Sequence, residues 1–303
     1  MATTRKRRTP KRRATSDGGT RAVEVASAPR AGNGRMLGAL RLVHPFPALL
    51  VTAVTAGLVP IADPDASAAL YVQLGLGMLF YQFAIGVVND ISDRDADAAV
   101  KPWKPIPAGV VSVERARLVA AVLVAAGLLV TATLDSGAWL IGIGGLACGM
   151  VYDAGIKRTA WSFVPWAVAF PLIPTWVFVA AGEWDALLWW TFPIGALLAL
   201  ALHLANQSPD ASDDRGLGSR GLPQLLGPRR SARVSLALFG LGVSSAAVVL
   251  VFESPARAVL VAVTGALALV LAPRAVLFFG RDGLFGLLAA SAAATALVFL
   301  SAV

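Results

Sequence analysis

Four carboxylates and an amide lie within one short stretch of this chain, at the end of a long apolar segment. The stretch runs from Asn89 to Asp97 and reads NDISDRDAD. If a helix continues through it, Asp90, Asp93 and Asp97 have the spacing i, i+3 and i+7 and share one face. Asp95 lies off that face. Carboxylates at a membrane boundary are unfavourable unless they face water, pair with cations or hold a metal ion, so this spacing predicts a site of chemistry.

A second acidic stretch, from Asn206 to Asp214, closes another apolar segment. Asp210 and Asp214 have the spacing i, i+4 and also share a helical face. Four apolar segments separate the two stretches, and an even number of membrane crossings returns the chain to the same side. A bundle could therefore bring the two stretches together across a cavity.

Facing carboxylates without a His or Cys cluster suit a hard cation such as Mg²⁺, which takes oxygen ligands and often shares them with phosphate. The implied ligand is a diphosphate. Basic side chains near both stretches could neutralise the rest of its charge. These basic residues are Lys101, Lys104, Lys157, Arg158, Arg215 and Arg220.

The composition places these acids in a polytopic membrane protein. Hydrophobic residues make up 57% of the 303 residues, charged residues 15%, and the mean hydropathy is +0.70. Apolar segments of about 20 residues, enough to cross the bilayer, predict an all-α fold of nine transmembrane helices around a central cavity, with a cytoplasmic cap. The expected spans are 37–61, 67–89, 114–134, 137–153, 161–181, 185–206, 232–252, 256–279 and 283–302. Prolines within several of them predict kinks, and Gly142, Gly144, Gly145 and Gly149 predict close helix packing.

The net charge of +8 comes from the N-terminus, where ten of the 26 Lys and Arg residues precede Met36. Residues 1–35 are too polar to fold and predict a disordered basic cytoplasmic tail, with one membrane domain over 36–303. No nucleic-acid partner is expected. The alternate connections carry the Lys and Arg excess, which places the N-terminus in the cytoplasm and the C-terminus on the opposite side.

These motifs resemble those of the UbiA superfamily of intramembrane prenyltransferases. The stretch Asn89–Asp97 matches the form NDxxDxxxD, Lys101–Gly109 is similar to a basic RPIPSG-type loop, and Asp210–Asp214 matches DxxxD. The resemblance implies a helical bundle in which Mg²⁺, held by both Asp motifs, binds a prenyl diphosphate. Diphosphate departure would leave an allylic carbocation, which a lipophilic acceptor attacks.

The resemblance also assigns residue roles. Asp90, Asp93, Asp97, Asp210 and Asp214 would be the metal-binding and catalytic acids. The expected diphosphate-binding residues are Asn89, Arg41, Lys101, Lys104, Tyr152, Lys157, Arg158, Asn206, Arg215 and Arg220. Two departures stand out: Tyr152 and Lys157 are five residues apart rather than the commoner four, and Gly221 follows Arg220 where many members have a hydroxyl residue.

Three functions are compatible with this pattern. We expect Mg²⁺-dependent transfer of a prenyl group to a lipophilic, possibly aromatic, acceptor in the lipid bilayer. An intramembrane terpene cyclase, which needs no acceptor, is the alternative, and a transporter is disfavoured because coupling acids usually lie near the bilayer midplane. His44 and His203 are interpreted as structural residues. The sequence favours no particular oligomeric state.

Overall fold

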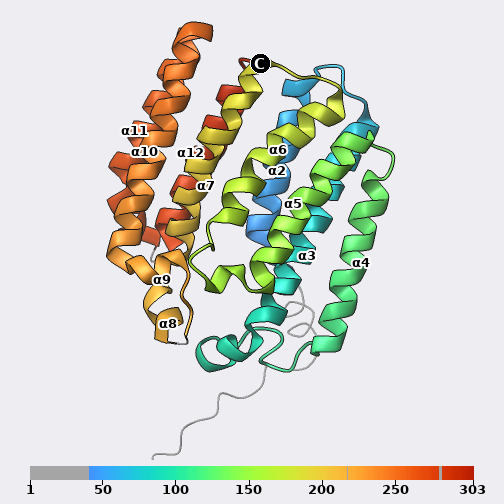
Figure 1. Cartoon of the computed structure of the whole chain (residues 1–303), viewed down its shortest axis with the longest axis vertical. Helices are drawn as coiled ribbons and strands as arrows, with labels where there is room; N and C mark the ends of the chain where they lie inside the picture. Colours follow the sequence, from blue (N-terminus) through green and yellow to red (C-terminus); the bar gives the residue numbers. More distant parts are fainter. Residues whose placement is uncertain (1–40, 217, 280–281) are drawn as a thin grey trace, which may run out of the picture.

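The computed structural model describes residues 41–216, 218–279 and 282–303, which form an all-helical bundle (Figure 1). The expected tail, residues 1–35, lies outside the described residues. The α-helices are α2 (Pro45–Ala62), α3 (Ala68–Val100), α4 (Val113–Thr131), α5 (Ser136–Ala154), α6 (Val164–Ala181), α7 (Thr191–Gln207), α8 (Ala211–Gly216), α9 (Leu222–Leu226), α10 (Pro228–Glu253), α11 (Pro255–Phe279) and α12 (Gly283–Leu300). Three 3₁₀ turns join them: η1 (Arg41–Val43), η2 (Ile156–Arg158) and η3 (Ala186–Trp190).

Each expected span coincides with a long helix, but the membrane-spanning count differs from the prediction. In the described ranges, eight helices are long and apolar enough to cross a membrane. The ninth, α4, is 19 residues long and carries Glu114, Arg115 and Arg117 in its first turns. Those charges lie at the helix end, where they can reach water. Helix α4 therefore remains the expected ninth crossing, although any stretch of it long enough to span the membrane includes these three charges.

Helix α3 extends well past its expected end. It begins after Ser67, whose side chain accepts a hydrogen bond from the backbone N–H of Leu70, and it continues through the acidic stretch to Val100. It stops where Pro102 follows Lys101, because proline disfavours helical geometry in the residue before it. The extra three turns carry the acids of the first motif beyond the apolar part of the bundle.

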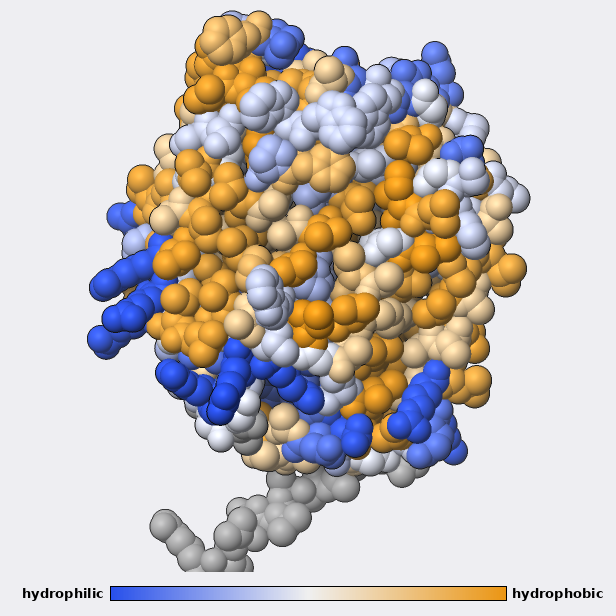
Figure 2. Space-filling model, in the orientation of Figure 1, coloured by the Kyte–Doolittle hydropathy of each residue, from blue (hydrophilic) through white to orange (hydrophobic). Residues whose placement is uncertain are grey.

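The two ends of the bundle differ in polarity. Helices α8 and α9 and the connection between α3 and α4 lie at one end, and the C-terminus lies at the other (Figure 1). The space-filling view shows an apolar band around the middle and hydrophilic residues at both ends, gathered most densely at the end that carries α8 and α9 (Figure 2). We call this the polar end.

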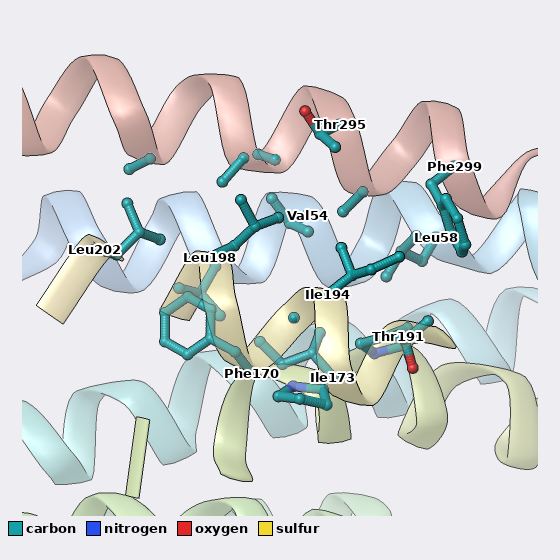
Figure 3. A pocket seen from close by; sticks show the side chains of 18 of the residues that line it. Val54, Leu58, Phe170, Ile173, Thr191, Ile194, Leu198, Leu202, Thr295 and Phe299 are labelled. Atoms are coloured by element: carbon teal, nitrogen blue, oxygen red, sulfur yellow. The ribbon is translucent and has the colours of Figure 1, made fainter. Parts of the chain in front are cut away.

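An apolar cavity lies inside the bundle between α2, α6, α7 and α12 (Figure 3). Its wall includes Pro47, Pro171 and Pro174, and all but two of its lining residues are apolar, the exceptions being Thr191 and Thr295. The expected cavity is therefore present. Its long direction follows the helices.

Two of the four glycines expected to allow close packing do so. A Cβ at Gly142 would lie 3.0 Å from the Trp176 indole nitrogen, and one at Gly149 would collide with Ile85. At Gly144 it would make only an ordinary contact, 3.8 Å from Leu172, and at Gly145 it would face open space. Gly127, which the sequence did not single out, also lies at a close contact, where α4 meets α3. Its added Cβ would lie 2.5 Å from the ring of Tyr81.

Replacing Gly127 by alanine is expected to destabilise the protein by about 1–3 kcal/mol, because the added methyl overpacks a rigid aromatic contact. Gly145→Ala is the matched control, since nothing lies within 4 Å of its added Cβ. Thermal unfolding in detergent should show a lower midpoint for the first variant only. Equal midpoints would contradict the close packing of α4 on α3.

Candidate active site at the polar end of the bundle

Asp90 and Asp97 are buried near the end of α3 and share one cation. Their exposed fractions are 1% and 5%. Lys104, from the connection after α3, places its Nζ 2.9 Å from Asp90 Oδ1 and 2.7 Å from Asp97 Oδ2. The ammonium group thus bridges two acids that lie two turns apart on one face of α3, the face that the i, i+7 spacing predicted.

His44 approaches the same carboxylate from the start of α2. Its Nε2 lies 3.0 Å from Asp90 Oδ1. Its backbone has a φ of 48°, a left-handed conformation that is uncommon for any residue other than glycine. Backbone strain at this position therefore coincides with a direct contact to the first acidic motif.

Asp93 belongs to a second group of ions, formed with α5 and η2. Lys157 Nζ lies 2.8 Å from Asp93 Oδ2 and 3.1 Å from Asp153 Oδ1. Arg158 Nη2 lies 3.3 Å from Asp93 Oδ1, and Asn89 Nδ2 donates to Asp153 Oδ1 at 2.7 Å. Lys157 is only 7% exposed, so these carboxylates are the groups that compensate its buried charge.

The two acidic stretches meet at this end of the bundle. Lys101 Nζ, at the end of α3, donates to Asp210 Oδ2 at 2.9 Å, across 109 residues of sequence. Asp210 lies in the turn between α7 and α8. The contact brings the DxxxD segment to the same face as the acids of α3.

A polar chain ties Asp214 to the bundle. Gln224, on α9 and 1% exposed, donates through Nε2 to Asp214 Oδ2 at 3.1 Å and to Gln207 Oε1 at 3.3 Å. Gln207 in turn donates to the Tyr152 hydroxyl. Helices α8 and α9 are thereby fixed over the ends of α5 and α7.

Several expected residues lie outside these contacts. Asn206, Arg215 and Arg220 are exposed at the polar end, and Arg41 begins η1, with its side chain outside what the structure describes. Asp95 is 85% exposed and pairs with its neighbour Arg94 at 3.2 Å, consistent with its position off the shared face. In the second stretch Gln207, rather than Asn206, makes the buried amide contacts.

Sequence reasoning missed Asp153, Gln207 and Gln224. Asp153 carried the same signal as Asp90, since it is an acid at the end of an apolar helix and lies four residues before Lys157. Gln224 carried no local signal, because its role depends on how α9 folds back over the bundle.

The ion pairs shift the pKa values of the lysines outside the spanning helices. Burial alone would lower the pKa of Lys104, but hydrogen bonds and charge from Asp97 and Asp90 outweigh burial and raise it. The pKa of Lys101 is likewise raised, with burial opposed by Asp210. Both side chains therefore remain cationic at neutral pH, as diphosphate binding requires.

Asp214 shows the opposite balance. Burial, followed by the neighbouring charge of Asp210, raises the pKa of the Asp214 carboxyl, and the hydrogen bond from Gln224 only partly offsets this. The ligand-free protein thus holds an acid whose charged form is unfavourable, and such carboxylates are typical of sites that bind a cation.

Asp214→Asn is expected to stabilise the ligand-free protein at neutral pH, because the amide keeps an acceptor for Gln224 and removes the unfavourable charge. Because the pKa of Asp214 is raised in the folded state, its charged form destabilises the fold at pH values above that raised pKa. The destabilisation disappears as the pH falls below the ordinary pKa of an aspartate, where Asp214 is protonated in both the folded and the unfolded state. Thermal unfolding without divalent metal should show a gain near pH 7 that vanishes below about pH 4. A gain that grows as the pH falls would contradict this account.

The donor set fits Mg²⁺ in its chemistry. All five expected ligands are carboxylates, and Asp90 Oδ2 is buried without a hydrogen-bond partner. In the part of the chain that the structure describes, no three acidic, His or Cys side chains converge closely enough to share one metal ion. Lysine ammonium groups lie between the acids instead, so a metal would exchange places with them.

An aromatic group separates the acids from the apolar cavity. Trp166 stacks on Phe170, with ring centroids 5.3 Å apart, and lies 6.1 Å from Tyr152 and 5.4 Å from His203. Phe170 lines the cavity. His203 is fully buried, with Nε2 3.1 Å from Ser162 Oγ, in agreement with its structural interpretation.

These features define a class of protein: an apolar helical bundle with a lysine-neutralised acidic site at one end and an apolar cavity behind it. The model of the UbiA prenyltransferase family matches residues 48–284. The chain belongs to this family, and with its apolar helices it is an integral, multi-pass membrane protein.

Curated relatives agree. A 4-hydroxybenzoate octaprenyltransferase of Citrobacter koseri is 30% identical over 192 residues, which cover 62% of this chain and 66% of the relative. A digeranylgeranylglyceryl phosphate synthase of Methanoculleus marisnigri is 29% identical over 150 residues, covering 48% of this chain and 53% of the relative. The matched region therefore spans about half to two thirds of these relatives.

Solved structures share the fold over nearly their whole length. A UbiA homolog from Archaeoglobus fulgidus bound to GPP and Mg²⁺ superposes with a TM-score of 0.66 at 20% identity, covering 86% of this chain and 99% of that one. The apo structure of a UbiA homolog from Aeropyrum pernix K1 gives 0.67 at 20% identity, covering 83% and 95%.

Proposed function

We propose that this protein transfers a prenyl group from a prenyl diphosphate to a lipophilic acceptor within the membrane, with Mg²⁺ as cofactor. The observation that carries the proposal is the Lys101–Asp210 contact, which joins the two acidic motifs at the polar end. An apolar cavity lies behind them, so the diphosphate and the apolar tail of one substrate could bind next to each other.

The diphosphate would be held by cations that now pair with acids. Lys101, Lys104, Lys157 and Arg158 have their charged groups within 3.3 Å of carboxylate oxygens. When diphosphate enters, these groups can donate to its oxygens and release the carboxylates. Arg41, Arg215 and Arg220 are proposed to add charge around this group, and Asn89, Tyr152 and Asn206 to add polar contacts.

The metal is proposed to lie between the five acids Asp90, Asp93, Asp97, Asp210 and Asp214. When bound, Mg²⁺ would neutralise charge that develops on the departing diphosphate. The buried carboxylates keep this region polar, and Lys104 and Lys157 remain near enough to pair with the leaving group. The allylic cation would form beside Tyr152 and Trp166, whose rings can stabilise positive charge.

The prenyl tail is proposed to occupy the cavity between α2, α6, α7 and α12, with the acceptor entering near the aromatic group. The relatives' names suggest acceptors of two kinds, an aromatic acid and a glyceryl phosphate. Both carry an anionic group, and the basic polar end suits such a group.

We further propose that the polar end faces the cytoplasm, with the C-terminus on the other side. The lysines and arginines at this end support that orientation, since cytoplasmic connections are rich in them. A reporter fused after Val303 should be accessible only from the side of the membrane opposite the cytoplasm.

The test is turnover by the purified full chain in detergent or liposomes. With Mg²⁺ and geranylgeranyl diphosphate, pyrophosphate should be released only when an acceptor such as 4-hydroxybenzoate or a glyceryl phosphate is added, and a prenylated product should appear. Release without any acceptor, together with a cyclic hydrocarbon, would instead establish the cyclase. No release under either condition would overturn the proposal.

A further inference from the structure

A chain of hydrogen bonds runs from the second acidic motif to Tyr152. Gln224 Nε2 donates to Asp214 Oδ2 at 3.1 Å and to Gln207 Oε1 at 3.3 Å. Gln207 Nε2 in turn donates to the Tyr152 hydroxyl. The chain starts on α8, passes through α9 and the end of α7, and reaches the end of α5. It therefore joins a proposed metal ligand to a proposed diphosphate contact.

The direction of every bond in this chain follows from its first member. The Asp214 carboxylate has no proton to give, so the group that faces it must be the NH₂ of Gln224. The second N–H of that amide requires an oxygen, which is Gln207 Oε1. Gln207 is left with its NH₂ toward Tyr152, whose oxygen accepts. The phenolic proton of Tyr152 is consequently available for another acceptor.

Close packing holds the Gln224 amide in place. Gln224 is 1% exposed, and Gly221, three residues before it, leaves room for the amide. A Cβ at position 221 would collide with Gln224 Oε1 and would lie 2.8 Å from the backbone oxygen of Lys157. Any side chain at position 221 would therefore disturb the amide.

The Gln224 amide also carries an unfavourable acceptor. Its Oε1 is buried and has no hydrogen-bond partner among the described residues. A methionine would fill the position without leaving a buried oxygen unpaired. Space filling alone thus favours an apolar residue here, whereas donation to two oxygens requires an amide.

The position of α9 does not depend on this amide alone. The backbone N–H of Arg220 donates to the carbonyl oxygen of Arg158 at 2.9 Å, and that of Leu222 donates to Ser162 Oγ at 3.0 Å. These bonds fix the start of α9 without using any atom of Gln224. The amide is therefore available for a role beyond the attachment of α9.

We propose that Gln207 and Gln224 are positioning residues that set the Tyr152 hydroxyl as a hydrogen-bond donor to the diphosphate. This inference rests on the proposed function, in which Tyr152 contacts the diphosphate. Neither glutamine is proposed to touch the substrate, and each acts through Tyr152. Because the Tyr152 oxygen accepts from Gln207, its proton must point away from that amide. The hydroxyl thus meets the anion already oriented as a donor.

The test is a set of double-variant cycles that measure binding, so it needs no acceptor. The full-length protein in detergent with Mg²⁺ is titrated calorimetrically with geranylgeranyl S-thiolodiphosphate. Tyr152→Phe should weaken binding about tenfold or more, because it removes a hydrogen bond to a charged group.

The same change is then made in the Gln207→Glu background, where it should weaken binding by less than about twofold. A carboxylate at position 207 can only accept, so it takes the Tyr152 proton away from the diphosphate. The added negative charge weakens binding both with and without Tyr152→Phe, and it cancels in the comparison.

Two further backgrounds complete the test. Gln224→Met removes both donors and lets the Gln207 amide turn, so the effect of Tyr152→Phe should fall to about threefold. Gln73→Glu is the matched control, because Gln73 also donates to a hydroxyl, that of Thr133, near the other end of α3. There Tyr152→Phe should keep its full effect. Thermal unfolding of each variant is measured alongside, to show that the fold is intact.

The outcomes separate the two proposals. If the analogue does not bind the unmodified protein in the presence of Mg²⁺, the proposed function is wrong. If it binds but Tyr152→Phe weakens binding by the same factor in every background, the glutamines only support the fold. The positioning role is then overturned and the proposed function stands. The same conclusion follows if Tyr152→Phe leaves binding to the unmodified protein unchanged.

Discussion

Asp90→Ala is expected to lower prenyl-diphosphate turnover about a thousandfold, the loss typical of removing one preorganised charge-stabilising group. Asp90 is the most buried acid of the first motif, and its Oδ2 has no partner in the ligand-free protein. Its Oδ1 contacts both His44 and Lys104. Removing it deprives the proposed metal of a ligand and frees Lys104 from one of its two carboxylates.

Asp95→Ala is the matched control for this prediction. It makes the same substitution on the same helix, but the side chain is 85% exposed. Its turnover should stay within about twofold of the unmodified protein, since exposed pairs contribute little. The measurement is pyrophosphate release by both variants. If Asp90→Ala kept more than about a tenth of normal turnover, the proposed role of Asp90 as a metal ligand would be contradicted.

Asp153→Ala is expected to cause the largest loss of stability, about 3–5 kcal/mol. Asp153 and Lys157 are 1% and 7% exposed, and their charged atoms lie 3.1 Å apart. Removing the acid leaves the lysine ammonium in a buried position with Asp93 as its remaining carboxylate. It also removes the acceptor of Asn89. Thermal and denaturant unfolding in detergent should both report the loss.

A double variant separates stability from function at this pair. Asp153→Leu combined with Lys157→Met replaces the buried ions by apolar side chains of similar volume, which should recover much of the lost stability. Turnover should stay low, because the proposed diphosphate cation is gone. Recovery of both properties would show that Lys157 is only structural.

The periodic part of the site could be predicted from the sequence. The i, i+3, i+7 spacing placed Asp90, Asp93 and Asp97 on one face because α3 continues through the motif, and it left Asp95 in solvent. The return of the second acidic stretch to the same end followed from an even number of apolar segments. Both predictions depend only on helix geometry and on crossing number.

The partners of those acids could not be predicted in the same way. Lys104 reaches two acids of α3 only because the following connection turns back under the helix, and Lys157 reaches Asp93 across 64 residues. Gln224 depends on the fold of α9. Such contacts are set by tertiary packing, which leaves no periodic trace in the sequence.

The most direct test of the account is calorimetric titration of the full chain with geranylgeranyl S-thiolodiphosphate, once with Mg²⁺ and once with EDTA. We predict tight binding that requires Mg²⁺ and that Asp90→Ala abolishes, because the acids would hold the metal and the lysines the diphosphate. Equal affinity in Mg²⁺ and EDTA would contradict the central claim that the two acidic motifs form one metal-dependent diphosphate site.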